Sequence, residues 1–242
     1  MLVIGTTEGV FLAAAGESPR GSDLSSRDVK VLRRTNGHVL AGTNDGVYRS
    51  ADGGRGWQRV GLEGRQVLEV MPAPSDPRTV YAGTVPAALF RSRDGGATWS
   101  DVDSFAQAFD AGTWGIPAIT GWPAGARAHS IVVDPDDPER CLVGIEVGGV
   151  VSNSDDGSTW TTTLPGGVPD IHYAVADPIG RSASIAQPAS AASANWQRCR
   201  RRSALPVCSP RTMVEIRGGT SGQECCIGTR VRCASILGLR MR

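Results

Sequence analysis

Three copies of one eight-residue pattern constrain the fold of this chain more than any other feature. The copies are residues 50–57 (SADGGRGW), 92–99 (SRDGGATW) and 153–160 (NSDDGSTW). Each has Ser or Asn first, Asp third, Gly fifth and Trp eighth, and each follows a stretch in which apolar residues alternate. We call each copy a Trp-turn. Recurrence of one pattern along a chain indicates an architecture built from similar units.

The sequence around each Trp-turn predicts a unit of four strands. Strands are expected at 39–43, 80–84 and 141–145, each followed by a short turn, a second strand, the Trp-turn and a strand that begins at the Trp. A further apolar strand precedes these units, as at 67–70 and 131–133, and residues 2–12 resemble a unit without a Trp-turn. Four strands in roughly 40 residues is the size of one propeller blade. We therefore expect an all-β fold, a β-propeller of four-stranded antiparallel blades, with about four blades in an incomplete ring.

The residue types of the Trp-turn suit a tight hairpin. Asp accepts hydrogen bonds from backbone N–H groups a few residues on, Gly adopts positive φ, and Trp packs between sheets. One carboxylate per loop is too few for a calcium site, so we expect no metal and no cofactor. We predict purely structural roles for the Asp and Trp residues of the three turns, which are Asp52, Trp57, Asp94, Trp99, Asp155 and Trp160.

The pattern resembles the Asp-box, or bacterial neuraminidase (BNR) repeat, found in β-propellers such as sialidases, sortilin-type receptors and glycosidase-like proteins, within the wider group of WD40/YVTN-type repeats. The resemblance implies a propeller. Sialidases of this kind hold a carboxylate with three arginines and use a Tyr/Glu nucleophile and an Asp acid/base. Their Arg-Ile-Pro motif has its nearest counterpart in Gly115-Ile116-Pro117, which lacks the arginine, and no Tyr/Glu pair is identifiable. Catalytic residues are therefore not carried over from that family.

One connection between units is unusually long. The Asp residues of the Trp-turns are 42 residues apart from Asp52 to Asp94 but 61 apart from Asp94 to Asp155. The extra length is an insertion at 103–127, rich in Gly, Pro and Ala, which contains Trp114 and Trp122. Long loops between elements are uncommon unless they are functional or disordered. In a propeller this connection emerges on the face opposite the Trp-turns.

The composition changes near residue 179 and divides the chain into two regions. Residues 1–178, the propeller region, hold 14 basic and 22 acidic side chains, whereas 179–242 hold 11 Arg, two Glu and five of the six cysteines. After Asp177-Pro178, which matches Asp134-Pro135, neither the next strand nor a fourth Trp-turn is recognisable. We interpret 179–242 as an irregular tail that is not native propeller sequence, produced by a frameshift or a wrongly assigned terminus.

Other interpretations of the tail stay open. An arginine-rich segment could bind nucleic acid or an acidic membrane, but it lacks interleaved aromatic residues, so we expect no nucleic-acid partner. Zinc binding is disfavoured because no Cys-x-x-Cys pair and no His occur there. A disulfide framework would require secretion. A divergent final blade is the remaining alternative.

The N-terminal sequence and the hydropathy favour a cytoplasmic protein. Residues 1–8 lack the basic segment of a secretion signal, and Glu8 interrupts their apolar stretch. No run of 18 apolar residues occurs, so we expect no membrane-spanning helix and no membrane partner.

Aligned units bring several polar residues to equivalent positions near the propeller channel. His129 and His172 occupy the start of successive innermost strands, where Leu68 stands in the preceding unit, and Glu146 takes the place of Asn44 and Val85. A convergence of acid, base, cation and aromatic groups is typical of a binding pocket, although polar residues at such a channel are commonly only solvated. The candidate ligand-binding residues are Arg127, His129, His172, Trp114 and Trp122, and the weak catalytic candidates are Glu146 and Asp170.

Three functions are compatible with this pattern. The first is a module that binds a carbohydrate or a protein ligand, with no catalysis demonstrable from sequence. The second is a glycoside hydrolase, exo-sialidase-like, that uses Glu146 and Asp170, which would then lie about 5–10 Å apart. The third is a scaffold, similar to the propellers that help build photosynthetic complexes. Whether the chain is an enzyme, and its oligomeric state, are left open by the sequence.

Overall fold

A computed structural model describes most of the first 176 residues of the chain. The described residues are 1–108, 125–146, 148–153, 156–163, 171 and 173–176, together with the backbone of two later strands at 182–187 and 212–217. Among them, no helix is long and apolar enough to cross a membrane.

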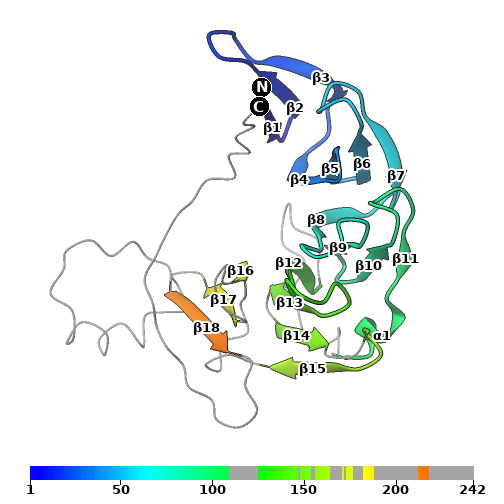
Figure 1. Cartoon of the computed structure of the whole chain (residues 1–242), viewed down its shortest axis with the longest axis vertical. Helices are drawn as coiled ribbons and strands as arrows, with labels where there is room; N and C mark the ends of the chain where they lie inside the picture. The colour runs from blue at the N-terminus through cyan, green and yellow to red at the C-terminus, as the bar shows by residue number, and fades with distance from the viewer. Residues whose placement is uncertain are drawn as a thin grey trace, which may run out of the picture.

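The described strands form five antiparallel sheets, three of which have four strands. The four-stranded sheets follow the order β4-β5-β6-β7, β8-β9-β10-β11 and β12-β13-β14-β15, and the outer two sheets are β1-β2-β3 and β16-β17-β18. Figure 1 shows β1 to β15 following one another round an arc. This confirms the predicted all-β fold of four-stranded antiparallel blades in an incomplete propeller.

Each sheet is built from strands that are consecutive in the sequence. The first sheet contains β1 (Leu2–Thr6), β2 (Gly9–Ala13) and β3 (Arg20–Ser25); the second contains β4 (Val29–Thr35), β5 (His38–Thr43), β6 (Gly46–Ser50) and β7 (Gln58–Gly61). The third contains β8 (Gln66–Pro72), β9 (Val80–Val85), β10 (Leu89–Ser92) and β11 (Ser100–Asp101), and is followed by the short helix α1 (Asp103–Ala106). The fourth contains β12 (Arg127–Val133), β13 (Cys141–Glu146), β14 (Gly149–Asn153) and β15 (Trp160–Thr163). The fifth contains β16 (Tyr173–Ala176), β17 (Ser182–Gln187) and β18 (Thr212–Arg217).

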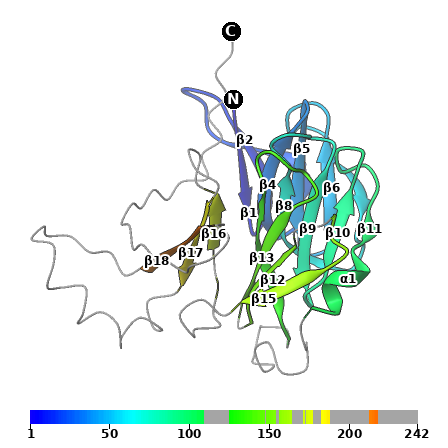
Figure 2. The same cartoon turned by 60° about the horizontal axis from the view of Figure 1, so that its bottom comes forward.

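The first strand of each four-stranded sheet is the innermost one. The strands β4, β8 and β12 lie next to one another, β8 between the other two (Figures 1 and 2). All three have a β-bulge at the same place in their pairing with the second strand, between Val29 and Val31, Val67 and Glu69, and Ala128 and Ser130. Successive blades therefore share one register, and residues can be compared position by position.

A glycine in the second strand of each four-stranded sheet lets the inner strand of the next sheet approach closely. A Cβ on Gly42 would lie 3.0 Å from Val67 Cγ1, and a Cβ on Gly83 would lie 2.5 Å from the backbone oxygen of Ala128. The same approach recurs at Gly144 of the fourth sheet, where a Cβ would lie 2.7 Å from Ile171 Cγ2. The repeated Gly at this position is thus explained by contact between blades.

The apolar core lies between neighbouring sheets, and the Trp of each Trp-turn closes it. Trp57 packs on a cluster shared by the first and second sheets, and Trp99 on one shared by the second and third. Trp160 packs on the cluster between the third and fourth sheets, where its ring meets Phe105 of α1 edge to face at 5.2 Å. Each Trp therefore joins its own blade to the preceding one, where indole rings bury a large apolar area.

The tail contains strands that the sequence does not reveal. We expected no strand after Pro178, whereas the backbone of β17 pairs with β16 and that of β18 pairs with β17. The segment Ser-Ala-Ser-Ile-Ala-Gln of β17 has small residues and weak β-propensity, which is why the sequence does not predict this strand. The rest of the tail, and the predicted boundary between 178 and 179, lie outside the described residues.

Candidate functional site

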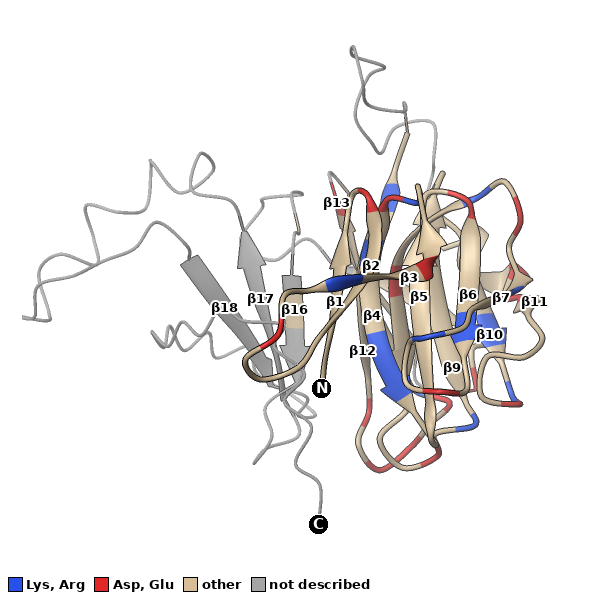
Figure 3. Ribbon diagram, turned by 90° about the horizontal axis from the view of Figure 1, so that it is seen from above, with Lys and Arg blue, Asp and Glu red and all other residues tan. Residues whose placement is uncertain are grey.

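The sheets have two ends with different chemistry. We call the end that carries the Trp-turns the Trp-turn end, and the opposite end, at which the inner strands begin, the mouth end. Figure 3 shows that many of the acidic residues in the described part of the chain lie in the turns at these two ends.

The first Trp-turn is held by its own serine and aspartate. The Ser50 hydroxyl donates to Asp52 Oδ1 at 2.8 Å and accepts from the N–H of Gly54 at 2.7 Å. Asp52 Oδ1 also accepts from the N–H groups of Arg55 and Gly56, both at 2.9 Å. These hydrogen bonds lower the pKa of Asp52, and the bond from the Gly56 N–H has the largest effect. The Trp57 indole N–H donates to the Gly54 carbonyl at 2.9 Å.

The second Trp-turn repeats this network. Asp94 accepts from the N–H groups of Ala97 and Thr98 and from the hydroxyls of Ser92 and Thr98, at 2.6 to 2.9 Å. Burial favours the neutral carboxyl, but the hydrogen bonds from Thr98, Ser92 and Ala97 together outweigh it and lower the pKa of Asp94 to about 2. A carboxylate whose acceptor sites are taken up by its own turn has little capacity left for a ligand.

The third Trp-turn differs at its first residue. Asn153 stands where the others have Ser, and its amide accepts from the Cys141 N–H at 2.6 Å and donates to the Glu139 carbonyl at 2.7 Å. It therefore ties the turn to the start of the neighbouring strand β13. Trp160 donates to the Gly157 carbonyl at 3.1 Å, as Trp57 does to Gly54. Asp155 lies outside the described residues.

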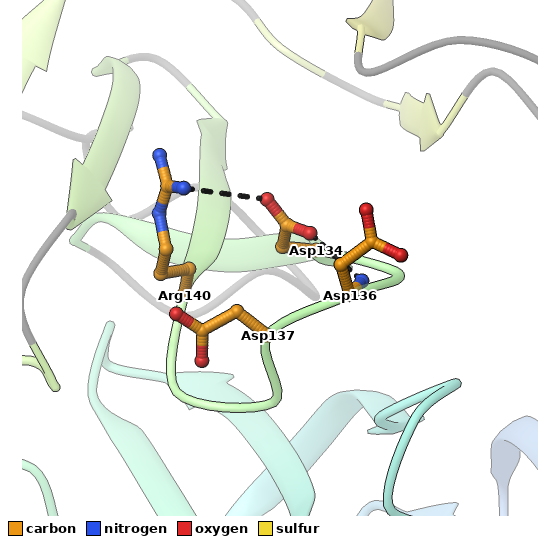
Figure 4. Close-up of a pocket in the computed structure, with 4 residues that line it drawn as sticks. All are labelled: Asp134, Asp136, Asp137 and Arg140. Atoms are coloured by element: carbon orange, nitrogen blue, oxygen red, sulfur yellow. Dashed lines mark hydrogen bonds and ion pairs between the residues drawn. The ribbon is translucent and has the colours of Figure 1, made fainter.

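The turn between β12 and β13, also at the Trp-turn end, forms a shallow acidic hollow. Asp134, Asp136, Asp137 and Arg140 line it (Figure 4). Arg140 lies 3.7 Å from Asp134, and Asp134 also accepts from the Asp136 N–H at 2.9 Å. Within the described ranges no three His, Cys, Asp or Glu side chains are placed to hold a metal ion. The hollow is accounted for by the hydrogen bonds of the turn.

The mouth end places different side chains at one register position in successive blades. In the third sheet Gln66 pairs with Val85, and in the fourth Arg127 pairs with Glu146. In the second sheet the corresponding residues are Asp28 and Asn44, which exchange hydrogen bonds: the Asp28 N–H donates to the Asn44 side chain at 3.2 Å and the Asn44 N–H donates to the Asp28 carbonyl at 3.0 Å. The structure thus gives Glu146, Asn44 and Val85 equivalent places, as the alignment of the units predicts.

Arg127 and Glu146 form a buried ion pair across β12 and β13. Arg127 Nη1 lies 3.2 Å from Glu146 Oε2, and the two side chains are only 3% and 8% exposed. The pair is therefore almost completely shielded from solvent. A buried ion pair is retained only when attraction repays the desolvation of both charges, so removal of either partner is costly.

The bulges determine which residues stand out at the mouth end. The extra residue of each bulge is Lys30 in β4, Leu68 in β8 and His129 in β12. Lys30 is exposed and pairs with Asp28, while Leu68 and His129 are half-buried. Bulges re-aim a side chain relative to the regular pleat, so each inner strand presents one residue at an equivalent position near the start of the strand.

The described part of the site is smaller than the predicted one. Arg127 and Glu146 pair at the start of the fourth sheet, and His129 is the bulged residue two positions after Arg127. Trp114, Trp122, Asp170 and His172 lie outside the described residues. The distance between Glu146 and Asp170, on which the hydrolase prediction depends, and the stacking role of the two Trp residues accordingly stay predictions.

The structure adds mouth-end residues that the sequence patterns did not predict. These include the Asp28–Lys30 pair and a cluster around Asp45, whose carboxylate lies 3.2 Å from Arg59 Nη1 and 3.9 Å from Arg27 Nη2. Asp45 Oδ1 also accepts from the Gly64 N–H at 3.1 Å. The repeated bulge gives Lys30 a place equivalent to Leu68 and His129, so an alignment of the strand at 29–35 with the later inner strands identifies it. No sequence pattern identifies the cluster around Asp45.

One buried acid lies between the two ends. Glu69 on β8 is 8% exposed, and its Oε1 lies 2.9 Å from Arg33 Nη2 of β4, so the pair bridges two blades. Burial raises the pKa of Glu69 to about 7, against the opposing influence of Arg33 and of the Val70 N–H. Glu69 is thus held near the midpoint of its titration at neutral pH.

Comparisons with known proteins identify the fold. No known protein-family profile matches the chain, and no curated protein matches its sequence. Among solved structures, an ancestral GH74 enzyme matches with a TM-score of 0.61 at 17% identity, over 93% of this chain and 28% of that protein. YCF48 from Cyanidioschyzon merolae matches with a TM-score of 0.56 at 14% identity, over 94% of this chain and 66% of that protein.

A third match widens the range of proteins with this fold. PorZ, a surface component of the type-IX secretion system of Porphyromonas gingivalis, matches with a TM-score of 0.50 at 15% identity, over 86% of this chain and 28% of that protein. At these identities the likeness concerns the fold alone, because one fold hosts many unrelated functions. The chain is similar in architecture to propeller-like proteins and spans less than two thirds of the length of the GH74 enzyme, YCF48 or PorZ.

Proposed function

We propose that this chain is a non-catalytic, ligand-binding β-propeller module that binds a glycan at its mouth end. The observation that carries the proposal is the repeated bulge. The same rigid backbone feature presents Lys30, Leu68 and His129 at equivalent positions of three adjacent inner strands. A constant scaffold with a changing side chain suits recognition, because binding residues are commonly positioned by a rigid framework.

The carboxylates of the Trp-turn end are less available to a ligand than the polar side chains of the mouth end. Asp52 and Asp94 use their oxygens to accept from the N–H groups of their own turns. At the mouth end, by contrast, charged groups bond to one another across short distances, as Asp28 does with Lys30. Such partners can be exchanged for a ligand without unfolding a hairpin, which favours the mouth end as the binding face.

The state of Glu146 favours binding over hydrolysis. A general acid or nucleophile must come within hydrogen-bond reach of the scissile bond. Glu146 is paired with Arg127, and its side chain is 8% exposed. A buried carboxylate that is paired with an arginine links β12 to β13 instead of contacting a substrate. A catalytic pair that includes Asp170 would therefore need a second carboxyl group other than that of Glu146.

The polarity of the described mouth end favours a glycan over an apolar protein surface. Sugar hydroxyls both donate and accept hydrogen bonds, and this end interleaves donors such as Lys30 and Gln66 with acceptors such as Asp28 and Asn44. Within the described residues, the exposed large apolar side chain is that of Met1, which precedes β1 and lies apart from the mouth-end bulges in sequence. Trp114 and Trp122 are proposed to supply the stacking surface from the insertion.

A glycan microarray, followed by calorimetry on each positive glycan, tests the proposal with the full chain. We expect the variants Lys30→Ala and His129→Ala each to weaken binding about tenfold, since a lost charged or aromatic contact in a binding site costs about 1–2 kcal/mol. The matched control is Arg78→Ala, an exposed cation at the Trp-turn end whose side chain bonds within its own turn.

Three results would contradict the proposal. Equal loss in Arg78→Ala and Lys30→Ala would place the ligand elsewhere. Release of shortened sugar from a bound oligosaccharide, abolished in Glu146→Gln and detected by mass spectrometry, would make the protein a glycoside hydrolase. Absence of any bound glycan together with a stable protein complex would favour the scaffold alternative.

A further inference from the structure

The third and fourth sheets are joined at the Trp-turn end by a cluster of ion pairs. Arg91 of β10 and Arg93 of the second Trp-turn both pair with Glu139, in the turn between β12 and β13, at N–O distances of 2.5 and 2.6 Å. The Glu139 side chain is only 16% exposed. One carboxylate of the fourth sheet therefore neutralises two cations of the third.

The junction between the second and third sheets has the same backbone but lacks this acid. The turns at 73–79 and 134–140 each have seven residues and lie between equivalent ladder pairs of the third and fourth sheets. Glu139 is the sixth residue of its turn, and the sixth residue of the other turn is Arg78. A cation therefore stands at the second junction where an anion stands at the third.

Both turns are attached to the preceding sheet at the residue before this position. The Pro77 carbonyl accepts from the Thr35 hydroxyl of β4 at 2.6 Å, and the Pro138 carbonyl accepts from the Tyr81 hydroxyl of β9 at 3.0 Å. Each turn is thus held against the sheet that precedes it, and Arg78 lies beside the second sheet as Glu139 lies beside the third.

Arg49 of β6 is the equivalent of Arg91 and faces the same way. Arg49 pairs with Leu40, and Arg91 pairs with Tyr81; residues directly opposite in a ladder share one face of the sheet. Leu40 faces the third sheet, because a Cβ on Gly96 would lie 2.9 Å from its Cδ1. Arg49 consequently faces the third sheet, as Arg91 faces the fourth.

The Arg49 guanidinium has no counter-charge among the described residues. Its Nε is buried without a hydrogen-bond partner, as is that of Arg91, but only Arg91 reaches a carboxylate. Ala51, which is exposed, stands in the place of Arg93, so the volume that Arg93 fills at the next junction is open. A half-buried cation without an anion is unfavourable. We call this place the Arg49–Arg78 junction.

The acid next to Arg78 belongs to its own turn. Asp76 accepts from the Arg78 N–H and from the Thr79 hydroxyl, both at 3.2 Å, and its distance to Arg78 Nε is 3.4 Å. Its equivalent Asp137 accepts in the same way from the Glu139 N–H at 3.0 Å. Asp76 is therefore part of the turn and does not replace the missing carboxylate.

We propose that the Arg49–Arg78 junction binds an Asp or Glu carboxylate of a partner polypeptide, in the place that Glu139 fills at the next junction. The carboxylate accepts from both guanidinium groups, as Glu139 accepts from Arg91 and Arg93. Hydrogen bonds between guanidinium and carboxylate groups are among the strongest in proteins, because both partners are charged.

The exposure of the junction favours a polypeptide over a free small acid. The Arg78 side chain is 72% exposed, and Pro74 and Ser75 of its turn are exposed. Water weakens an ion pair at such a surface. A polypeptide that covers the turn excludes this water and strengthens the pair, and arginine is enriched among the residues that dominate binding at protein interfaces. The proposed site uses none of the mouth-end residues.

Fluorescence anisotropy with the full chain tests the proposal. The probe is a labelled decapeptide of alternating Glu and Ser, and its control has Gln in place of Glu. We expect the Glu peptide to bind at least about tenfold more tightly than the Gln peptide at about 150 mM salt. Arg49→Gln and Arg78→Glu should each abolish that preference. Arg55→Glu is the matched control, because Arg55 is an exposed cation of the first Trp-turn that bonds to Asp52 of its own turn; it should keep the preference.

Urea denaturation gives a second readout that does not depend on the peptide. Arg78→Glu restores the charge pattern of the next junction, so it should raise the midpoint of unfolding. Arg49→Gln removes a cation without a partner and should leave the midpoint unchanged, whereas Arg91→Gln breaks the pair with Glu139 and should lower it. Binding of a neutral glycan should be unchanged in Arg78→Glu, so failure at this junction is distinguishable from failure of the glycan proposal.

Four results would overturn the proposal. An unchanged peptide preference in Arg49→Gln or Arg78→Glu would place the peptide elsewhere. Equal losses in Arg55→Glu and Arg78→Glu would mean that only the net charge matters. A peptide with phosphoserine in place of Glu that binds more tightly would make the ligand a phosphate. A concentration-dependent dimer in sedimentation, dissociated by Arg78→Glu, would mean that a second copy of this chain supplies the carboxylate.

Discussion

The two ends of the blades obey different rules. At the Trp-turn end, Ser50 and Asp52 in one blade and Ser92 and Asp94 in the next make the same bonds to their own backbone. At the mouth end, one register position holds Asp28 with Asn44, then Gln66 with Val85, then Arg127 with Glu146. At both ends the backbone repeats from one blade to the next. The side-chain chemistry repeats only at the Trp-turn end and changes from blade to blade at the mouth end.

The difference has a physical cause. Residues of the Trp-turn satisfy N–H groups of a hairpin that needs positive φ at Gly53 and Gly54, at 76° and 99°, so a change there leaves backbone donors unpaired. At the mouth end, the pairs Asp28–Lys30 and Arg127–Glu146 are contacts between two side chains, so a different pair can replace each of them as a unit. The mouth end is therefore the part of the blade that can differ in chemistry while the fold stays the same.

Splitting the Arg127–Glu146 pair should have the largest effect on the stability of the chain. Arg127→Ala leaves the Glu146 carboxylate buried without its cation, so we expect a loss of about 3–5 kcal/mol in the free energy of unfolding. The double variant Arg127→Leu/Glu146→Leu should cost far less than either single change, because no buried charge stays behind. Urea denaturation measures all three; additive losses would show that the pair is not exchangeable as a unit.

A pH titration of stability tests the state of Glu69, which lies between the two ends. The pKa of Glu69 is raised to about 7 by burial, so the folded chain holds this proton more tightly than the unfolded chain. Its contribution to stability is complete below the unfolded pKa and is lost as the pH rises through about 7. We expect the unfolding free energy to fall by roughly 2–3 kcal/mol between about pH 4.5 and about pH 8 from this group.

Glu69→Gln is the matching control for that titration, since it keeps the shape and removes the charge. The difference in stability between Glu69→Gln and the unchanged chain should shift in favour of the variant as the pH rises from about 5 to about 8. A difference that stays constant over this range, measured by urea denaturation at each pH, would mean that Glu69 does not titrate there.

Paired substitutions at the two ends test the difference between them most directly. Asp94→Ala removes the acceptor of two backbone N–H groups and two hydroxyls, and we expect a loss of about 2 kcal/mol. Lys30→Ala removes an exposed ion pair at the mouth end and should cost under about 0.5 kcal/mol. Equal losses in thermal or urea unfolding would erase the distinction between the ends.

Much of the fold could be predicted from the sequence, and particular residues show why. The Trp-turn spacing, the alternating strands and the strand Gly at 42, 83 and 144 all encode short-range or repeated contacts, so they predict the four-stranded blade and the packing of each Trp between sheets. The equivalence of Leu68 and His129 also follows from the repeat. In contrast, the small residues of β17 have weak β-propensity, so the sequence does not reveal that this segment pairs with β16.

The candidate site could be predicted only in part. The alignment of units predicts equivalent positions for Glu146, Asn44 and Val85, but the sequence carries no sign that Arg127 and Glu146 form a buried ion pair. Lys30 occupies the same bulge position as Leu68 and His129, but its strand at 29–35 follows no Trp-turn that would mark it as an inner strand. Burial depends on what stands opposite a residue, and that neighbour is distant along the chain.

The repeat, the blade and the chemistry of the Trp-turn can be read from the sequence, because they depend on hydrogen bonds and dihedral preferences within a few residues. Which charges face solvent and which are paired follows from tertiary contacts alone. Glu69 pairs with Arg33 across two blades, Glu146 pairs with Arg127 across two strands, and Lys30 is exposed. Identical residue types acquire different roles there because electrostatic and hydrophobic energies depend on the neighbours that folding supplies.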